Sequence, residues 1–524
     1  MPDSNQPHEA AQIDRRQLLQ GAVGAGLAAG LSAIPGKLAM AAEKDALAKS
    51  GAKRSASLQA ENAQPGTPDW QLTYTRVDPT TLYRSPWIEG FVSKASVKAG
   101  ESLDLFVSTR PVDRFRVDIY RLGYYGGTGG RLMAELGEFQ GLEQPDPPVG
   151  EERLRECQWE ATTAIEIPAD WPSGVYLGKL SLVKGRYQSY VVFIVRDERP
   201  ADIVFQCSDN TWQAYNRWPD NYSLYDADTG KKWNLLPGVK VSYDRPYGKY
   251  CQILDAPLSQ GAGEFGLWEF PFAYWLEQHG YDVTYCSNTD VHADAQCAAR
   301  GKVFLSVGHD EYWSLEQFEH VQQAVKSGTS VGFFSGNTCC FVAPFSQSSR
   351  GVDNRILTRA GRYGGVSEAE KTSMGPFPME GPNEAQLIGA RTTSPYNGSA
   401  DWIVTDATHW LFANTGMKNG DRIAGLVGWE FHGEPADLPG LKVIAEGTAI
   451  NGRDLEAHWT ATVYPGPKEN WVFNAATIFW AQGLSRPPGH IPPYSHYGRP
   501  HGPDARVEKI TENFLAKCGV VRLV

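Results

Sequence analysis

The sequence predicts two folded domains, an Ig-like β-sandwich and then a three-layer α/β domain of glutamine-amidotransferase-like type with a mostly parallel sheet. Across residues 69–197, short runs of alternating polar and apolar residues are punctuated by Gly and Pro, which is typical of an all-β sandwich. Across residues 198–518, apolar runs of strand length alternate with amphipathic runs of helix length, which indicates an α/β domain. Residues 42–68 contain few large apolar residues and predict a flexible linker.

The first 41 residues resemble a twin-arginine export signal. Arg15 and Arg16 precede a weakly apolar run rich in Gly and Ala at residues 18–34, and residues 39–41 supply the small side chains that a signal peptidase needs. A transmembrane anchor is the alternative, but the run is short and rich in glycine. We therefore expect a periplasmic or secreted protein with no membrane span in the mature chain.

Composition limits the partners of the chain. It has 60 acidic and 49 basic residues, a net charge of −11, and no basic cluster interrupts this balance. Nucleic acid is therefore not an expected partner. The eight cysteines follow the export signal, where disulfides are permitted, but their spacing includes no CxxC pair. This spacing argues against a zinc ribbon and leaves any disulfide pairing open.

The α/β domain is organised around one predicted βαβ unit. Residues 303–307 and 331–334 are short apolar runs with the composition of buried parallel strands. Between them, Ser314 and Gln317 offer a capping box that begins a helix, and Gly328 ends it. The segment between the first strand and the helix then lies where open α/β sheets bind ligands.

That segment, HDEYW, is the main candidate site. Its first four side chains, His309, Asp310, Glu311 and Tyr312, can supply a metal ligand, a general base and an oxygen donor within one turn of chain. Alternatively, the two carboxylates only complement the helix dipole while Tyr312 packs in the core. The predicted catalytic residues are His309, Asp310, Glu311 and Asn337.

Other strand ends are expected to meet this segment, because the carboxyl ends of parallel strands share one edge of a sheet. The first of these rim loops follows a predicted strand at residues 202–207, and a purely structural turn is the alternative for it. The residues expected to line a substrate pocket are Asp209, Asn210, Trp212, Tyr215 and Trp313.

The α/β part is similar to the carboxyl-terminal domain of the large (beta) subunit of N,N-dimethylformamidase and its relatives. The matching blocks are NTWQAYNRW, WLEQHGYDVTYCSNTDV, VGHDEYWS, SGNTCCF, PNEAQLIGA, GDRIAGLVGWEF and WVFNAATIFWAQGL, in the order of the family. The VGHDEYWS and WVFNA blocks are the most specific. The resemblance implies a glutamine-amidotransferase-like α/β layer beside a β-sandwich.

In the enzyme that names the family, the resemblance implies hydrolysis of a small formamide at a mononuclear iron held by two tyrosines and a glutamate. Tyr312, in the HDEYW block, is the position that carries over as a ligand. Tyr274 and Glu380 are the candidates nearest to the expected places of the other two ligands. The resemblance also implies a small partner subunit, and a homo-oligomer is the other possibility.

These observations predict an exported hydrolase of a small amide, with iron as the candidate cofactor. The competing class is a non-catalytic exported protein that binds a ligand or glycan with the aromatic rim formed by Trp212, Trp218 and Trp313. A third interpretation is metal-free hydrolysis of another C–N bond, which would depend on an acidic residue such as Glu311.

Overall fold

The computed structural model describes residues 58–226, 235–248, 263–366, 376–450, 455–491 and 501–522. The expected export signal and residues 42–57 of the expected linker lie outside these residues. The described end of that linker is not a free tether, because residues 58–62 are helical and Asn62 donates a hydrogen bond to Glu277 at 3.0 Å. No helix among the described residues is both long enough and apolar enough to cross a membrane.

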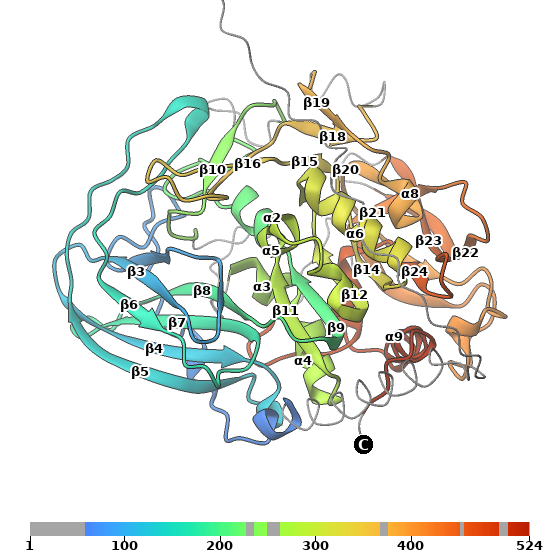
Figure 1. Ribbon diagram of the computed structural model, residues 1–524, viewed down its shortest axis with the longest axis horizontal. Helices are drawn as coiled ribbons and strands as arrows, with labels where there is room; N and C mark the ends of the chain where they lie inside the picture. The colour runs from blue at the N-terminus through green and yellow to red at the C-terminus, as the bar shows by residue number, and fades with distance from the viewer. Residues whose placement is uncertain are drawn as a thin grey trace, which may run out of the picture. The chain divides into compact units, whose positions relative to one another are not determined.

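The first part of the described chain is a sandwich of two β-sheets (Figure 1). One sheet has the order β1 (Glu89–Val92), β3 (Ser102–Ser108), β6 (Thr163–Glu166). The other has the order β2 (Ser96–Lys98), β8 (Gln188–Arg196), β7 (Gly174–Leu182), β4 (Arg114–Leu122), β5 (Gly130–Gln140). Apolar residues of both sheets, among them Leu105, Ile119 and Phe193, form one core between them, as the alternating pattern predicts.

The second part is built on a nine-stranded sheet whose two halves differ. Five strands run parallel, in the order β11 (Val283–Ser287), β9 (Ala201–Cys207), β12 (Gly301–His309), β14 (Ser330–Gly336), β24 (Trp471–Asn474). Four antiparallel strands continue the order as β23 (Glu456–Pro465), β22 (Lys442–Ile450), β20 (Ala390–Ile403), β21 (Arg422–Pro435).

The prediction of a mostly parallel sheet is therefore only half right. The strands β20, β21, β22 and β23 follow one another along the chain without the long helical crossovers that parallel pairing requires, so they pair antiparallel. The parallel half, by contrast, has a helix after most of its strands. This half carries the strand ends on which the site prediction was based.

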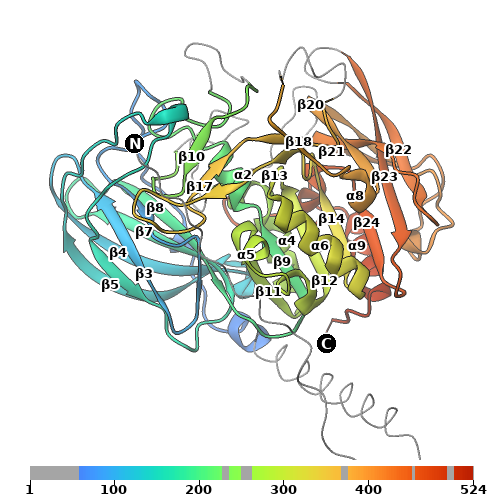
Figure 2. The same ribbon diagram turned by 45° about the horizontal axis from the view of Figure 1, so that its top comes forward.

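Helices cover both faces of the parallel strands, which gives the three layers that the sequence predicts (Figures 1 and 2). On one face, Phe334 contacts Phe272 and Phe514, with ring centroids 4.9 and 5.7 Å apart. On the other face, Phe333 shares an apolar cluster with Phe318. Besides the helical residues 58–62, the α-helices among the described residues are α2 (Asp209–Ala214), α3 (Gly263–Trp268), α4 (Phe270–Gln278), α5 (Asn288–Ala293), α6 (Leu315–Ser327), α8 (Ala385–Ile388) and α9 (Ala505–Lys517).

The central βαβ unit has the predicted helix boundaries. The Ser314 hydroxyl accepts a hydrogen bond from the Gln317 N–H at 3.0 Å, and Gly328 ends α6 with a φ of +110°. A left-handed backbone at this point favours glycine.

Short elements complete the described chain. Two small sheets have the orders β13 (Tyr312–Trp313), β15 (Phe341–Val342), β18 (Gly361–Tyr363), β19 (Met379–Gly381), and β10 (Lys240–Ser242), β17 (Ile356–Thr358), β16 (Phe345–Ser346). The 3-10 helices are η1 (Pro68–Trp70), η2 (Tyr125–Gly127), η3 (Glu151–Arg153), η4 (Ala298–Arg300), η5 (Trp410–Phe412) and η6 (Ile478–Gly483). The seven described cysteines are free thiols, and six of them are buried.

A buried ion pair joins the sandwich to the α/β part. Arg121 of β4 binds both carboxylate oxygens of Glu277 on α4, at 2.8 and 2.9 Å, and neither side chain is exposed. Tyr285 also donates a hydrogen bond to Glu277 at 2.9 Å. The charges neutralise each other within the interface, so the loss of either one would leave the other buried without compensation.

Candidate functional site

The candidate site lies where the ends of β12 and β14 meet β21. His309 is the last residue of β12, and Asn337 follows the end of β14. Glu430 lies on β21, and the backbone of this strand comes very close to the end of β14. A Cβ built on Gly336 would lie 2.2 Å from the carbonyl oxygen of Glu430, so only glycine fits there. Gly308 is required for a similar reason, since its Cβ would lie 2.7 Å from that of Trp268 and its φ is +71°.

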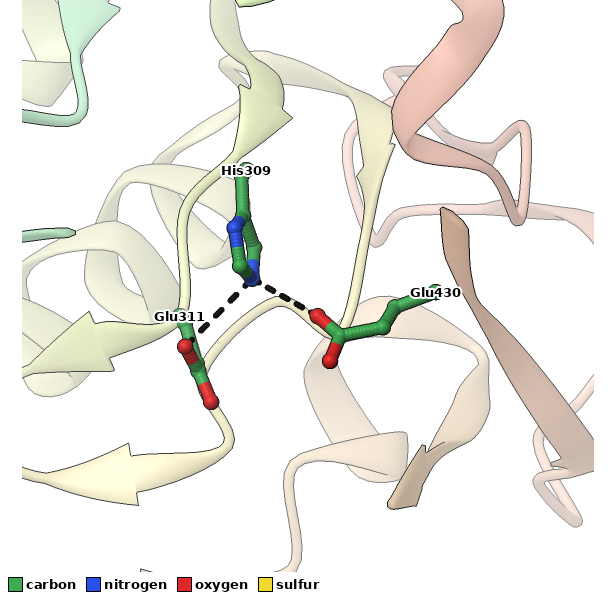
Figure 3. A group of neighbouring side chains, drawn as sticks. All are labelled: His309, Glu311 and Glu430. Carbon is green, nitrogen blue, oxygen red and sulfur yellow. Dashed lines mark ion pairs between the residues drawn. The ribbon is translucent and has the colours of Figure 1, made fainter. Parts of the chain in front are cut away.

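His309, Glu311 and Glu430 form one buried group (Figure 3). The Nε2 atom of His309 lies 2.8 Å from a carboxylate oxygen of Glu430 and 3.3 Å from one of Glu311. One ligand atom from each residue lies within 4.8 Å of the others, so the three side chains could hold a metal ion.

The Glu311 carboxylate accepts hydrogen bonds from three side chains, two tyrosine hydroxyls and one asparagine amide. Tyr215 donates a hydrogen bond to its carboxylate at 2.8 Å, and Tyr225 does so at 2.7 Å. The side-chain amide of Asn337 donates to Glu311 at 3.1 Å and to Glu430 at 3.0 Å. Two phenols and two carboxylates thus converge beside one imidazole.

Burial and charge shape the ionisation of this group. Burial alone would lower the pKa of His309, but the carboxylates of Glu430 and Glu311 outweigh it and raise that pKa to about 10. Burial raises the pKa of Glu430, and His309 opposes this rise. Burial, and then the Glu311 charge, raise the pKa of Tyr215 and Tyr225 well above the usual range. The imidazole of His309 therefore carries a second ring proton, and with it a positive charge, at neutral pH between Glu430 and Glu311.

Aromatic rings enclose the imidazole of His309. The ring of Tyr215 lies 5.2 Å from it, and the rings of Trp268 and Trp429 lie 6.2 and 6.1 Å from it at nearly right angles. Such apolar walls lower the local dielectric constant and strengthen the electrostatic interactions inside the group.

Comparison with protein families identifies the kind of protein to which this site belongs. A family model described as N,N-dimethylformamidase beta subunit-like, C-terminal, matches residues 116–496, well over half of the chain. The chain belongs to this family. A comparison with curated proteins finds no match. The matched region of this dimethylformamidase-like chain begins within β4 of the sandwich and includes His309, Glu311 and Glu430.

Of the four predicted catalytic residues in this chain, the structure brings three together: His309, Glu311 and Asn337. The fourth, Asp310, faces the core instead. Its carboxylate accepts hydrogen bonds from Gln206 at 2.5 Å, Ser306 at 2.8 Å and Asn288 at 3.0 Å. Asp310 therefore fixes the HDEYW segment to the neighbouring strands, and burial raises its pKa.

Among the predicted pocket residues, Tyr215 reaches the group and the first rim loop supports the HDEYW backbone. Asn210 donates a hydrogen bond to the carbonyl oxygen of Tyr312 at 2.9 Å, and Asp209 accepts one from the Asn288 N–H at 2.7 Å. Burial raises the pKa of Asp209 to about 7. These two side chains therefore position the loop that carries the group.

The predicted tryptophan rim is buried. The indole of Trp212 donates a hydrogen bond to Glu269 at 2.7 Å, and Trp313 lies in the apolar cluster with Phe333. Trp212, Trp218 and Trp313 are 3%, 0% and 0% exposed, so they offer no surface for a glycan. The binding-protein interpretation loses its main support.

The three predicted metal ligands do not meet in the described structure. Tyr312 is buried against Phe341 in the apolar cluster that also contains Tyr215 and Tyr225. Tyr274 lies on α4 against Tyr124 of the sandwich, with ring centroids 5.2 Å apart. Glu380 is exposed on β19, in another part of the chain.

The sequence prediction missed Glu430 and Tyr225. A signal existed for Glu430, because it lies in the GDRIAGLVGWEF block that resembles the family. Tyr225 lies only ten residues after Tyr215, but on irregular chain where no periodicity indicates the direction of a side chain. Both positions depend on how distant segments fold back to the strand ends.

Proposed function

We propose that this chain hydrolyses the C–N bond of a small amide at the group formed by His309, Glu311 and Glu430. Water adds to the amide carbonyl carbon, the C–N bond breaks, and the products are a carboxylic acid and an amine. The observation that carries the proposal is the buried His309–Glu430 pair, 2.8 Å apart, beside a second carboxylate in a family named for an amide hydrolase.

The two members of that pair can divide the proton transfers. Glu430 accepts a proton from the attacking water, and the imidazolium of His309 donates a proton to the leaving nitrogen. The pKa of His309, about 10, keeps a proton on the ring at neutral pH. Asn337 holds the two carboxylates in place through its hydrogen bonds to both.

The residues around Glu311 also fit the iron that the family resemblance implies. That resemblance calls for two tyrosines and a glutamate, and here Tyr215 and Tyr225 both bind the Glu311 carboxylate. Phenolate and carboxylate oxygens are hard anionic donors that suit ferric iron. Tyr215, Tyr225 and Glu311 are therefore the proposed iron ligands, instead of Tyr312, Tyr274 and Glu380. A bound iron would act as a Lewis acid toward the amide carbonyl.

Metal analysis and visible spectroscopy test the iron assignment. Protein purified in folded form should contain about one iron per chain and show a phenolate-to-iron absorption band. Tyr215→Phe and Tyr225→Phe should each weaken or shift this band. Tyr274→Phe is the matched control, since Tyr274 packs against the sandwich, and it should keep the wild-type spectrum. A band that survives both site substitutions would contradict the assignment.

Metal-free hydrolysis remains the second candidate, and the His309–Glu430 pair favours it, because this pair can move protons without an ion. Chelation distinguishes the two. Activity that persists in protein stripped of metal would support the metal-free route, and activity restored only by added iron would support the metal centre.

We also propose that the protein is exported and works with a small partner subunit. The export proposal rests on Arg15, Arg16 and the Gly- and Ala-rich run after them. The partner proposal rests on the family description, which names a beta subunit. Replacement of both arginines by lysine should retain the protein in the cytoplasm. Co-purification of a second, smaller chain from the native source tests the partner.

A further inference from the structure

His432 of β21 is a buried histidine that the proposed reaction does not use. It is 0% exposed, and both of its ring nitrogens have a hydrogen-bond partner from another part of the chain. Its Nε2 atom lies 3.1 Å from the backbone nitrogen of Thr338, in the turn after β14. Its Nδ1 atom lies 2.6 Å from Oδ1 of Asn474, the last residue of β24. One imidazole therefore joins three segments of the large sheet.

These partners allow a single protonation state of the His432 ring. A backbone N–H can only donate, so Nε2 must carry the lone pair that accepts the hydrogen bond from Thr338. Other contacts fix the orientation of the Asn474 amide, because Oδ1 also accepts from the Ala476 N–H at 2.8 Å and the amide nitrogen donates to the Thr460 carbonyl oxygen at 3.3 Å. Oδ1 therefore faces His432, and Nδ1 must donate to it. The ring is neutral, with its one proton on Nδ1.

The turn that His432 holds carries Asn337 of the candidate site. The side-chain amide of Asn337 donates a hydrogen bond to Glu430 at 3.0 Å, and the next residue along the turn donates its backbone N–H to His432. Glu430 and His432 are two residues apart on β21, so two neighbouring residues of the strand bind two neighbouring residues of the turn. Because the second of these bonds is made by the backbone, it fixes where the chain at Asn337 lies relative to Glu430.

Thr338 depends on this hydrogen bond. It is 0% exposed, its hydroxyl oxygen lies 2.5 Å from that of Ser335 on β14, and its carbonyl oxygen accepts from the Thr392 hydroxyl at 2.9 Å. Loss of the imidazole would leave its N–H buried without this acceptor, and a buried unpaired donor is costly. The turn would then gain by moving its N–H toward another acceptor, and Asn337 would move with it.

We propose that His432 is a positioning residue that sets the placement of Asn337 relative to Glu430, the proposed base. Nε2 holds the turn, and the hydrogen bond from Nδ1 to Asn474 holds the ring at the angle at which Nε2 meets Thr338. This inference rests on the proposed function and adds to it a residue that keeps the base and its amide partner in register. Misplacement of such groups by about 1 Å can lower a rate by about 10²-fold.

Two amide substitutions separate the two hydrogen bonds of the ring. In His432→Gln, the side-chain oxygen can take the place of Nε2 and accept from Thr338, whereas the shorter side chain of His432→Asn reaches only to the position of Nδ1. Asn474 tolerates both changes better than Thr338 does, since its Oδ1 keeps the hydrogen bond from Ala476.

The assay is the steady-state hydrolysis of N,N-dimethylformamide and N-methylformamide, with rates expressed per folded protein from circular dichroism. In His432→Asn, kcat should fall by about 10- to 100-fold while KM stays within about threefold of wild type. His432→Gln should recover kcat to within about fivefold of wild type, because it restores the acceptor for Thr338. His458→Asn, at an exposed position on β23, is the matched control and should behave as wild type.

A second comparison shows whether His432 acts through Glu430. In the Glu430→Gln background, His432→Asn should lower kcat by less than about threefold, because the base that it positions is already absent. An independent effect on structure would lower kcat by the same factor in both backgrounds.

The outcomes separate this inference from the proposed function. An unchanged kcat in His432→Asn, equal losses in His432→Asn and His432→Gln, or equal factors in the two backgrounds would overturn the positioning role and leave amide hydrolysis standing. A wild type that hydrolyses neither formamide, with and without iron, would overturn the proposed function and this inference with it.

Discussion

Glu430→Gln should abolish most of the activity without disturbing the fold. The substitution preserves the size of the side chain and an oxygen that can accept the hydrogen bonds from His309 and Asn337, now 2.8 and 3.0 Å from Glu430. It removes the charge and the ability to accept a proton. Because burial already raises the pKa of Glu430, the folded protein loses little by giving up this charge.

The expected loss follows from the role of Glu430 in the proposed reaction. Removal of a positioned general base typically lowers kcat by about 10²- to 10⁴-fold. The pKa of His309 should also fall, because Glu430 is the carboxylate that raises it most. A smaller fraction of the imidazole then carries the proton needed by the leaving nitrogen, which lowers kcat further at neutral and higher pH.

The assay is the steady-state hydrolysis of N-methylformamide by iron-loaded protein, with circular dichroism to verify the fold. Glu380→Gln is the matched control, since Glu380 is exposed on β19, and it should retain full activity. A kcat within about threefold of wild type for Glu430→Gln would refute the assignment of Glu430 as the base. A loss that appears only in KM would instead indicate a role in substrate binding.

Three other predictions concern stability. Glu277→Gln leaves Arg121 buried without its counter-charge and should lower the free energy of unfolding, measured by denaturant titration, by about 3–5 kcal/mol. The control is Glu138→Gln in an exposed ion pair, which should change the same free energy by less than about 1 kcal/mol. Burial lowers the pKa of His490 to about 4 and that of His501 to about 3, so each stabilises the fold above pH 6.5 and loses that contribution as the pH falls toward the folded pKa. When the pH is lowered from 7 to 5, the free energy of unfolding should therefore fall by about 2 kcal/mol less in His501→Phe than in wild type. An equal fall in both proteins would be inconsistent with a buried neutral imidazole. Removal of bound iron by a chelator should lower the midpoint temperature of thermal unfolding. Added iron at about 100 times its Kd should raise the free energy of unfolding again by about 2.7 kcal/mol. A midpoint that changes with neither treatment would count against a resident metal.

The sequence predicted the elements whose signals are local. The helix after HDEYW begins at Ser314 and ends at Gly328 because a hydroxyl cap and a left-handed glycine act within one turn of chain. The β-sandwich was predictable for a similar reason, since alternation along strands such as the first half of β4 records which face is buried. The antiparallel half of the large sheet was not, because an apolar run of strand length does not reveal the direction of its neighbour.

The members of the candidate site that the sequence predicted, His309, Glu311, Asn337 and Tyr215, lie at or shortly after predicted strand ends. His309 and Glu311 are two residues apart at a strand end, and that position alone identified them. Tyr274 was chosen by its distance along the chain from Tyr312, and Glu380 by its place before the PNEAQLIGA block. Neither criterion shows which side chains meet in space where long irregular segments intervene. Asp310 shows a further limit, because the sequence could not distinguish a carboxylate facing the site from one that binds Gln206 and Ser306 in the core.

The position of Glu430 shows how the two halves of the sheet cooperate. In strand order, β21 is the far edge of the nine-stranded sheet, five places from β14. Yet its backbone at Glu430 lies so close to Gly336, the last residue of β14, that a single methyl group would collide with it. The antiparallel half must therefore curl back over the carboxyl ends of the parallel strands. The parallel half supplies the imidazole and Glu311, as open α/β sheets do at their carboxyl edge, and the curled half adds Glu430, the proposed base.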